Sequence, residues 1–282
     1  MAKFLGVRGS NPARLFGAGG LKVIDPRRIA AASDADAAVA RLDPSSTARV
    51  TDVIWNWVFG ESLAGQWQHL SRVYIPRTNE LSAYTDLKNG ATATPAGTPV
   101  YAAQDGFVLQ YGDTVNLSAD LAALYGAANI DSCVVGHFTS SIADKSGFYY
   151  LIDADPFSSE LVIGGRVSTN KAVANWLSGF LGPTDTIYSD TKIEDQVVQV
   201  QSAVGAGAGY ALLSFADGDS DIVAPAGTPQ TALGTSVTVN AGFSAANSCT
   251  QTWGMSYIAS SSLDFAGFSV RAGAMMAALA IP

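Results

Sequence analysis

The chain has 282 residues, of which 48% are hydrophobic and only 14% are charged, and its formal net charge is −8. Soluble domains usually contain about a quarter charged residues, so this composition predicts a surface that partner molecules largely cover. No apolar run reaches the roughly 18 residues that span a bilayer, and the first residues lack the apolar core of a secretory signal. These features argue against a membrane-spanning or secreted protein.

The two halves of the chain repeat short motifs in the same order. The second member of each pair follows the first after 116 to 130 residues. The matching segments are residues 49–51 and 166–168, 56–57 and 175–176, 95–99 and 225–229, 114–116 and 238–240, and 127–133 and 245–249. Offsets that drift in this way are typical of loop insertions, because longer surface loops cost little closure entropy. We therefore expect one ancestral domain copied in tandem.

This duplication divides the chain into three segments. They are a basic N-terminal arm over residues 1–48, a first β domain over residues 49–165 and a second β domain over residues 166–282. A copy of about 117 residues is large enough to bury its own core. The pair Gly164 and Gly165 is expected at the boundary, where it would let the chain turn between two compact units.

Each copy is expected to open with a short helix. Val53, Ile54 and Trp57 fall at helical spacing in the first copy. Val173 and Trp176 have the same spacing in the second copy. The recurrence of tryptophan at matching positions indicates two equivalent core helices.

The rest of each copy is predicted to be mostly strand. Branched and aromatic residues alternate there with turn-forming glycine, asparagine, aspartate and proline. The predicted strands cover residues 100–103, 107–111, 148–152, 161–163, 197–200 and 237–239. One further helix is expected over residues 117–125 with Ser118 as its cap, and apolar residues 272–281 are expected to end as a packed strand or buried tail. The predicted fold is mainly β, with two tandem β-sandwich or jelly-roll-like domains that each carry a short helix.

The N-terminal arm is basic although the whole chain is acidic. Residues 1–41 contain seven basic and three acidic side chains. The side chains expected to make contacts are Lys3, Arg8, Arg14, Lys22, Arg27 and Arg28. Such an arm can contact phosphate in nucleic acid or in lipid head groups, or an acidic face of a neighbouring subunit. A tail that clasps a neighbouring chain is an equally good interpretation.

Residues that could carry out catalysis are scarce. His69 and His137 are the only histidines, and the chain has no Gly-x-Ser-x-Gly nucleophile motif. Cys133 and Cys249 stand at matching points of the two copies, where we expect them too far apart to bridge, as reduced thiols of a protein made in the cytoplasm. The sequence therefore predicts no catalytic residue, no cofactor and no enzymatic activity.

The densest acidic segment is a weak candidate for a calcium site. Asp217, Asp219 and Asp221 alternate as carboxylate ligands can. An EF-hand loop would have glycine at its sixth position and glutamate at its twelfth, but this chain has Ile222 and Thr228 there. A solvated turn is therefore the preferred interpretation.

In general plan, residues 49–282 resemble the double jelly-roll major capsid proteins, in which two similar β-barrels stand side by side in one chain. The resemblance implies a bacteriophage capsid subunit that forms homotrimers, assembles with other virion proteins into a shell and points its N-terminal arm to the interior. Our first expectation is accordingly a self-assembling protein of the virion shell.

Two other functions fit the same pattern. A phage tail-tube subunit with a duplicated domain would form six-fold-like rings from three chains. A tandem β-sandwich module could instead bind carbohydrate, with Trp57, Trp176 and Trp253 as stacking platforms. Exposed tryptophan side chains would favour the carbohydrate-binding alternative.

Overall fold

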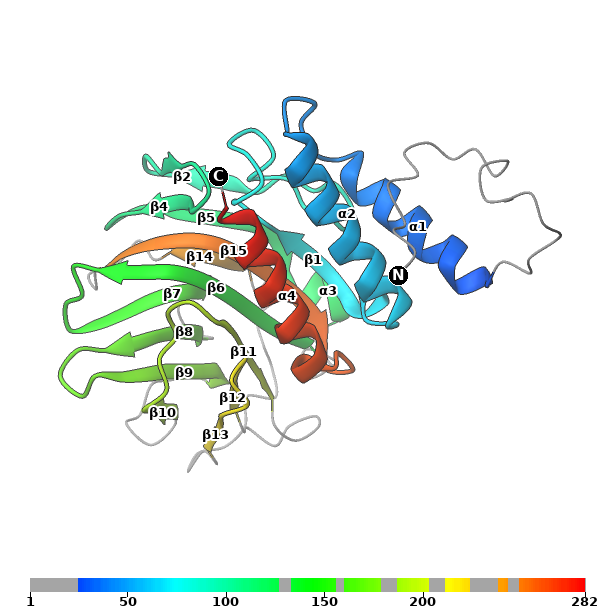
Figure 1. The fold of residues 1–282 in the computed structure, drawn as a ribbon. Coiled ribbons are helices and arrows are strands. Elements are labelled where there is room, and N and C mark those ends of the chain that lie inside the picture. Colours follow the sequence, from blue (N-terminus) through cyan, green and yellow to red (C-terminus); the bar gives the residue numbers. More distant parts are fainter. Residues whose placement is uncertain are drawn as a thin grey trace, which may run out of the picture.

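The computed structural model describes residues 25–126, 133–155, 160–178, 187–202, 211–223, 238–242 and 249–281. These residues form two antiparallel β-sheets packed face to face, with helices on one outer face (Figure 1). The protein is therefore mainly β, as predicted. Within the described ranges, no helix is both long and apolar enough to cross a membrane.

One sheet, called here the helix-covered sheet, has eight strands. Its order is β13-β12-β11-β6-β15-β4-β3, and β1 pairs with the second half of the long strand β15. The strands are β1 (Leu70–Tyr74), β3 (Val100–Ala102), β4 (Gly106–Leu109), β6 (Cys133–Ala143), β11 (Val197–Ser202), β12 (Ala211–Phe215), β13 (Ser220–Val223) and β15 (Thr250–Ser260).

The other sheet has seven strands in the order β10-β9-β8-β7-β14-β5-β2. They are β2 (Thr94–Ala96), β5 (Thr114–Asp120), β7 (Phe148–Asp155), β8 (Glu160–Arg166), β9 (Lys171–Ser178), β10 (Ile187–Ser189) and β14 (Thr238–Gly242). Inward side chains such as Val115, Leu117 and Val239 meet Phe107, Val135 and Trp253 of the helix-covered sheet in one apolar core.

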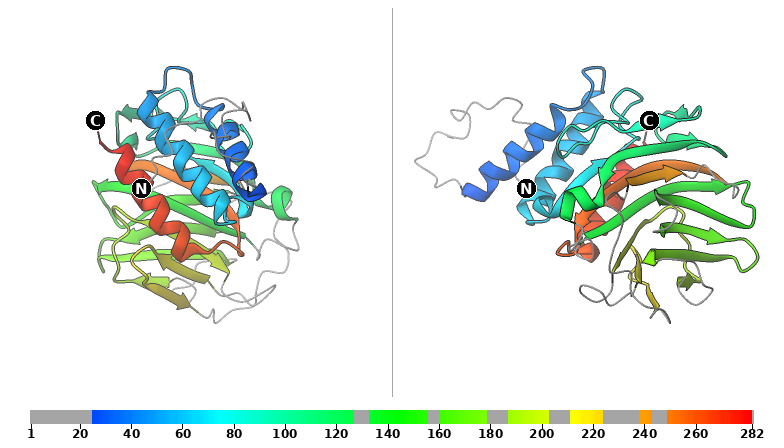
Figure 2. Two further views of the ribbon diagram at one scale, coloured as in Figure 1. Left: turned by 45° about the vertical axis from the view of Figure 1, so that its right-hand side comes forward. Right: turned by 180° about the vertical axis from the view of Figure 1, so that it is seen from behind.

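Three helices make a further layer. They are α1 (Pro26–Val39), α2 (Ala48–Leu63) and α4 (Phe265–Leu279), and Figure 2 shows all three on the same side of the sandwich. A second apolar core fills the space between them and the sheet. In it, Trp57 of α2 packs edge-on against Trp67 of the short 3-10 helix η2 (Trp67–His69) and against Phe268 of α4.

The helix predicted at the start of residues 49–165 is confirmed as α2. Thr47 caps it, because its hydroxyl accepts a hydrogen bond from the Val50 amide. The predicted C-terminal strand or tail is instead α4, capped by Asp264. Its apolar residues Ala272, Met276 and Leu279 recur at helical spacing and are buried against the sheet, which explains the helix.

The helix predicted from the spacing of Val173 and Trp176 is wrong, because both residues lie in strand β9 between β8 and β10. The helix predicted over residues 117–125 is shortened to α3 (Leu121–Tyr125). Ser118 lies in β5, and Asp120 caps α3 by accepting hydrogen bonds from the Ala122 and Ala123 amides. The helix ends at Gly126 as expected, at a φ of 79°.

Both sheets contain strands from both predicted halves, so the described strands do not separate into two sandwiches at residue 165. In the helix-covered sheet β6 lies between β11 and β15, and in the other sheet β14 lies between β7 and β5. The pair Gly164 and Gly165 lies within β8 rather than in a linker. A Cβ on Gly165 would lie 2.2 Å from the Tyr149 hydroxyl, so glycine there allows the ring to cover the neighbouring strand.

The repeated motifs fall into two groups in the structure. Residues 114–116 and 238–240 lie in β5 and β14, which pair with Asn116 opposite Asn240. Residues 56–57 lie in helix α2, whereas 175–176 lie in strand β9. Among the described segments, the matching residues thus have similar structure in β5 and β14 and different structure in α2 and β9, and duplication of a whole domain is not confirmed. Residues 225–229 and most of 127–133 and 245–249 lie outside the described part of the chain.

His137 lies fully buried between the sheets in a closed hydrogen-bond network. Its Nε2 is 2.9 Å from Gln251 Oε1, and its Nδ1 is 3.1 Å from the hydroxyl of Ser256. The Gln251 amide donates in turn to the Leu151 carbonyl, and the Trp253 indole donates to Ser256. This network fits a neutral imidazole with its proton on Nε2, and it gives His137 a structural role.

Stability is therefore expected to fall as the pH drops from 6.5 to 4. Burial lowers the pKa of His137 to about 4, so the unfolded chain binds a proton in this interval that the folded chain does not. A difference of this size corresponds to roughly 3 kcal/mol. Urea denaturation at several pH values will measure it, with His137→Gln as the comparison. If this variant loses as much stability as the parent over the same interval, His137 is not the group responsible.

Candidate functional site

An open pocket of about 560 Å³ lies on the helix-covered sheet beside the C-terminal half of α4. Ligand sites usually have volumes of about 300–1,000 Å³. The pocket is lined by the charged residues Arg77, Asp105 and Asp195, by three hydroxyl side chains, by the ring of Phe138 and by small residues of α4. The hydroxyl side chains and the two carboxylates reach the pocket from irregular segments of the backbone.

The hydroxyl groups come from a β-bulge between β6 and β15. Gln251 pairs with Ile142 and Trp253 pairs with Thr139, so β6 has one extra residue between these two pairs. The bulge places Ser140 and Ser141 beside Thr252, whose hydroxyl is 2.8 Å from that of Ser141. Bulges commonly redirect side chains in this way at functional sites.

Asp105 comes from the tight turn between β3 and β4. Gly106 follows it at a φ of 108°, and a Cβ there would lie 2.1 Å from the Trp253 carbonyl oxygen. Glycine therefore lets the turn lie directly on β15 next to Thr252. The side chain of Asp105 is 59% exposed, so its carboxylate is available to a ligand.

Asp195 comes from the segment before β11, which is fastened to β6 at two points. The Asp195 amide donates to the Thr139 carbonyl at 2.8 Å, and Glu194 accepts from the Ile142 amide at 3.0 Å. Asp195 has a φ of 61°, in the left-handed region that aspartate tolerates better than most residues. Its side chain is exposed at the pocket.

Arg77 forms the charged floor of the pocket and is only 5% exposed. Its guanidinium donates to the Asp105 carbonyl at 3.1 Å and to the Met276 carbonyl at 2.9 Å, and it lies 5.0 Å from the centre of the Phe138 ring. Burial lowers the pKa of Arg77, while the carboxylates of Asp105 and Asp195 oppose that shift. Arg77 thus joins the β3–β4 turn to the last turn of α4.

The helix side of the pocket is open because its residues are small. Gly273, Ala277 and Ala280 line it at spacings of four and three residues. A Cβ on Gly273 would meet no atom within 4 Å. A larger side chain at this position would project into free space and occupy the pocket.

Together these groups suit a ligand rich in hydroxyl groups. A carboxylate only accepts hydrogen bonds, a guanidinium only donates them, and serine and threonine hydroxyls do both. A ligand that pairs with all three must itself donate and accept within a small volume. A sugar ring with neighbouring hydroxyl groups has this property.

The residues singled out in the sequence lie elsewhere. Arg27 and Arg28 are exposed in the first turn of α1, where Arg27 pairs with Asp25 at 3.0 Å. Lys3, Arg8, Arg14 and Lys22 lie outside the described residues. Contact of this arm with phosphate stays a prediction.

The candidate calcium ligands belong to the turn between β12 and β13. Asp217 accepts from the Asp219 amide, and Asp219 accepts from the Thr191 hydroxyl at 2.7 Å. Asp221 lies in β13. No group of three or more acidic, histidine or cysteine side chains in the described part of the chain is placed to hold a metal ion.

Two of the three tryptophans do not provide the predicted stacking platforms. Trp57 is 6% exposed and Trp253 is fully buried, so both are core residues. Trp176 lies in β9, and its side chain lies outside the described part of the chain.

Sequence patterns also missed the pocket, because its residues come from separate irregular segments. The only local signal is the Ser140 and Ser141 pair within a β strand.

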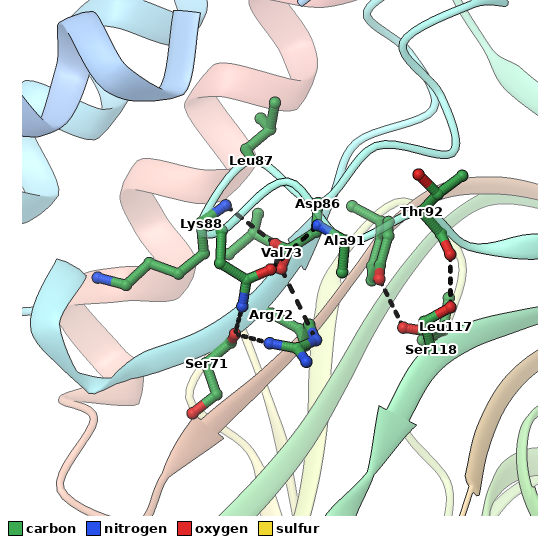
Figure 3. A network of polar contacts seen from close by, with 12 residues as sticks. Ser71, Arg72, Val73, Asp86, Leu87, Lys88, Ala91, Thr92, Leu117 and Ser118 are labelled. Carbon is green, nitrogen blue, oxygen red and sulfur yellow. Dashed lines mark hydrogen bonds and ion pairs between the residues drawn. The ribbon is translucent and has the colours of Figure 1, made fainter. Parts of the chain in front are cut away.

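A fully buried carboxylate outside the pocket, that of Asp86, has a structural role. Asp86 is fully buried, accepts from the Val73 and Lys88 amides at 2.8 and 2.9 Å, and lies 3.7 Å from Arg72 Nε (Figure 3). Burial raises the pKa of Asp86, and these amide hydrogen bonds oppose the shift. The carboxylate thereby fastens the turn after β1 to that strand.

No protein-family model matches the sequence, and no curated protein sequence matches it. Among solved structures, the chain is similar to the binding domain of botulinum neurotoxin DC in complex with SialylT, at 12% identity and a TM-score of 0.53, over 76% of this chain and 52% of that chain. It is also similar to a structure of botulinum neurotoxin type C, whose cell entry is described as dependent on interaction with two ganglioside molecules. That match has 13% identity, a TM-score of 0.53, and covers 77% of this chain and 53% of that chain.

A third similar structure is the binding domain of neurotoxin DC with rat synaptotagmin II, at 12% identity and a TM-score of 0.53, over 74% of this chain and 52% of that chain. The chain spans about half the length of these domains. At such identities the likeness shows a shared β-rich fold.

These likenesses overturn the expectation of a bacteriophage capsid subunit, because the similar structures are toxin binding domains and not virion proteins. The physical reason is visible in the topology. The described strands of both halves interleave in one sandwich, whereas two capsid-like barrels would each close their own sheets. The prediction of a virion shell is corrected with it, whereas the homotrimer and the virion partners stay predictions.

Proposed function

We propose that the protein is a carbohydrate-binding domain and that the pocket beside α4 holds the sugar. The observation that carries the proposal is the convergence of Asp105, Asp195 and Arg77 with hydroxyl groups on one open cavity of about 560 Å³. The β-sandwich fold shared with ganglioside- and SialylT-binding neighbours supports it.

The charged groups would orient the ligand. The exposed carboxylates of Asp105 and Asp195 would accept hydrogen bonds from pairs of sugar hydroxyls, and these charge-assisted bonds are stronger than neutral ones. The hydroxyls of Ser140, Ser141 and Thr252 would complete the contacts on the sheet. Because Arg77 is held by two backbone carbonyls, it would keep the site in shape before the ligand arrives.

Filling the pocket is expected to weaken glycan binding. Gly273→Trp places a large side chain in the free space beside Asp105 and Asp195. For a glycan that the parent protein binds on a glycan array, the affinity of this variant should be lower by at least about tenfold, which corresponds to about 1.4 kcal/mol. Gly273→Ala should bind normally, because its Cβ also meets open space.

The matched control is Gly60→Trp, which makes the same change at a position of α2 where a Cβ also meets nothing within 4 Å. Thermal unfolding of each variant checks that the fold is intact. Equal binding by the parent and by Gly273→Trp would remove this pocket from the proposal.

Absence of enzymatic activity stays a prediction, and mass spectrometry of the glycan recovered after incubation checks it.

A further inference from the structure

The pocket contains more negative than positive groups, and the negative groups are more accessible to a ligand. Two carboxylates, Asp105 and Asp195, face one guanidinium, that of Arg77. The pocket therefore has an excess of negative charge, and the whole chain adds to it with a formal net charge of −8. This field favours the approach of cations and opposes that of anions.

The single guanidinium is already occupied. Arg77 Nε donates to the Asp105 carbonyl, Nη1 donates to the Met276 carbonyl, and Nη2 lies 3.8 Å from Asp105 Oδ1. Because the side chain is 95% buried behind these contacts, it has little surface left for a ligand carboxylate. An acidic sugar would bring its charge next to two carboxylates without gaining a bidentate arginine.

The carboxylates are in the opposite situation. The side chain of Asp105 is 59% exposed, and Asp195 is exposed as well. Neither carboxylate accepts a hydrogen bond from a described residue, apart from the loose pairing of Asp105 with Arg77. An ammonium group has three N–H donors and no acceptor, so it is the complement of two such carboxylates.

We infer that the pocket selects amine-bearing sugars, such as glucosamine units with a free amino group, over neutral and sialylated sugars. This inference rests on the proposed carbohydrate-binding function. The ammonium would lie between Asp105 and Asp195, while the ring hydroxyls would meet Ser140, Ser141 and Thr252. The pocket would then differ in specificity from a site for sialylated glycans.

The test is isothermal titration calorimetry of the full chain at pH 6.5 with three probes. They are a glucosamine oligomer, the same oligomer fully N-acetylated, and 3′-sialyllactose. We expect the amine form to bind at least about tenfold more tightly than its acetylated counterpart. Higher salt should reduce this preference by screening the carboxylates. Equal or tighter binding of the acetylated or sialylated probe would overturn the inference and leave carbohydrate binding standing.

Variants of the pocket carboxylates test whether they cause the preference for the amine form. Asp105→Asn and Asp195→Asn should each lower affinity for the amine form more than for the acetylated form, so that the preference for the amine form falls several-fold. Asp25→Asn removes the same charge at the N-cap of α1, where asparagine caps equally well, and should have no effect. If Asp25→Asn has as large an effect, the preference is a general attraction to an acidic protein and the inference fails. If none of the probes and no array glycan binds, the proposed function itself fails.

Discussion

Replacing Arg271 with alanine is expected to destabilise the protein by about 3 kcal/mol, because it leaves a charge buried without a partner. Glu61 of α2 is fully buried, and its two oxygens accept bonds of 2.8 Å each from the Arg271 guanidinium of α4. Burial raises the pKa of Glu61, and the paired arginine opposes that shift. The expected loss lies at the lower end for a broken buried pair, since water reaches a third of the Arg271 side chain.

Urea denaturation will measure this loss. The control is the double variant Glu61→Gln with Arg271→Met, which removes both charges and should recover most of the stability. A loss below about 1 kcal/mol for Arg271→Ala would show that the pair behaves as an exposed surface salt bridge. The attachment of α2 to α4 would then depend on the apolar contacts around Phe268.

Gly136→Ala is expected to cost about 2–3 kcal/mol, because the added methyl group would overlap an immobile ring. A Cβ at this position would lie 2.0 Å from the Tyr257 ring on the paired strand. Tyr257 is fully buried, its hydroxyl donates to Gln199 at 3.2 Å, and its ring centre lies 4.8 Å from that of Phe268. The ring therefore has no free space to move into.

The comparison for this change is Gly60→Ala in α2, where a Cβ meets nothing within 4 Å. It should stabilise the protein by roughly 0.5–1 kcal/mol, as expected for glycine replaced by alanine inside a helix. Adding Tyr257→Leu to Gly136→Ala should recover part of the lost stability. If Gly136→Ala unfolds at the same urea concentration as the parent, the packing of Tyr257 over this strand is not as described.

Local patterns in the sequence predicted local structure well. The predicted strands at residues 161–163 and 197–200 lie in β8 and β11, residues 107–109 of the predicted strand 107–111 lie in β4, and the helical spacing of α2 was recognisable. Branched residues and a capping threonine act over a few positions, so no long-range information is needed to interpret them.

Local sequence patterns did not predict which strands pair over long distances in the chain. Trp176 has the spacing of a helix but lies in β9, a strand that pairs with β8 on one side and with β10 on the other. Repetition of short motifs indicated two domains, yet the matching segments 114–116 and 238–240 lie in strands that pair within one sheet, with Asn116 opposite Asn240. Neither helix propensity nor the repetition of motifs indicates which strands become neighbours in a sheet.

The pocket was hidden from the sequence for a related reason. Asp105, Ser141 and Asp195 are brought together by a turn, a bulge and a docked segment, and none of these has a recognisable spacing. Arg77 is separated from its partner Met276 by 199 residues. Only the tertiary structure shows that these side chains share one cavity.

The most direct test of carbohydrate binding at the pocket beside α4 is methyl NMR of the full chain during titration with a glycan that it binds. Carbohydrate binding at the pocket predicts shifts of the Thr252, Ala277 and Ala280 methyl signals, which line it. The methyl signals of Ala31 and Ala83, which are fully buried elsewhere, should not move. Shifts confined to residues away from α4 and β15, or no shift with any glycan, would contradict the account.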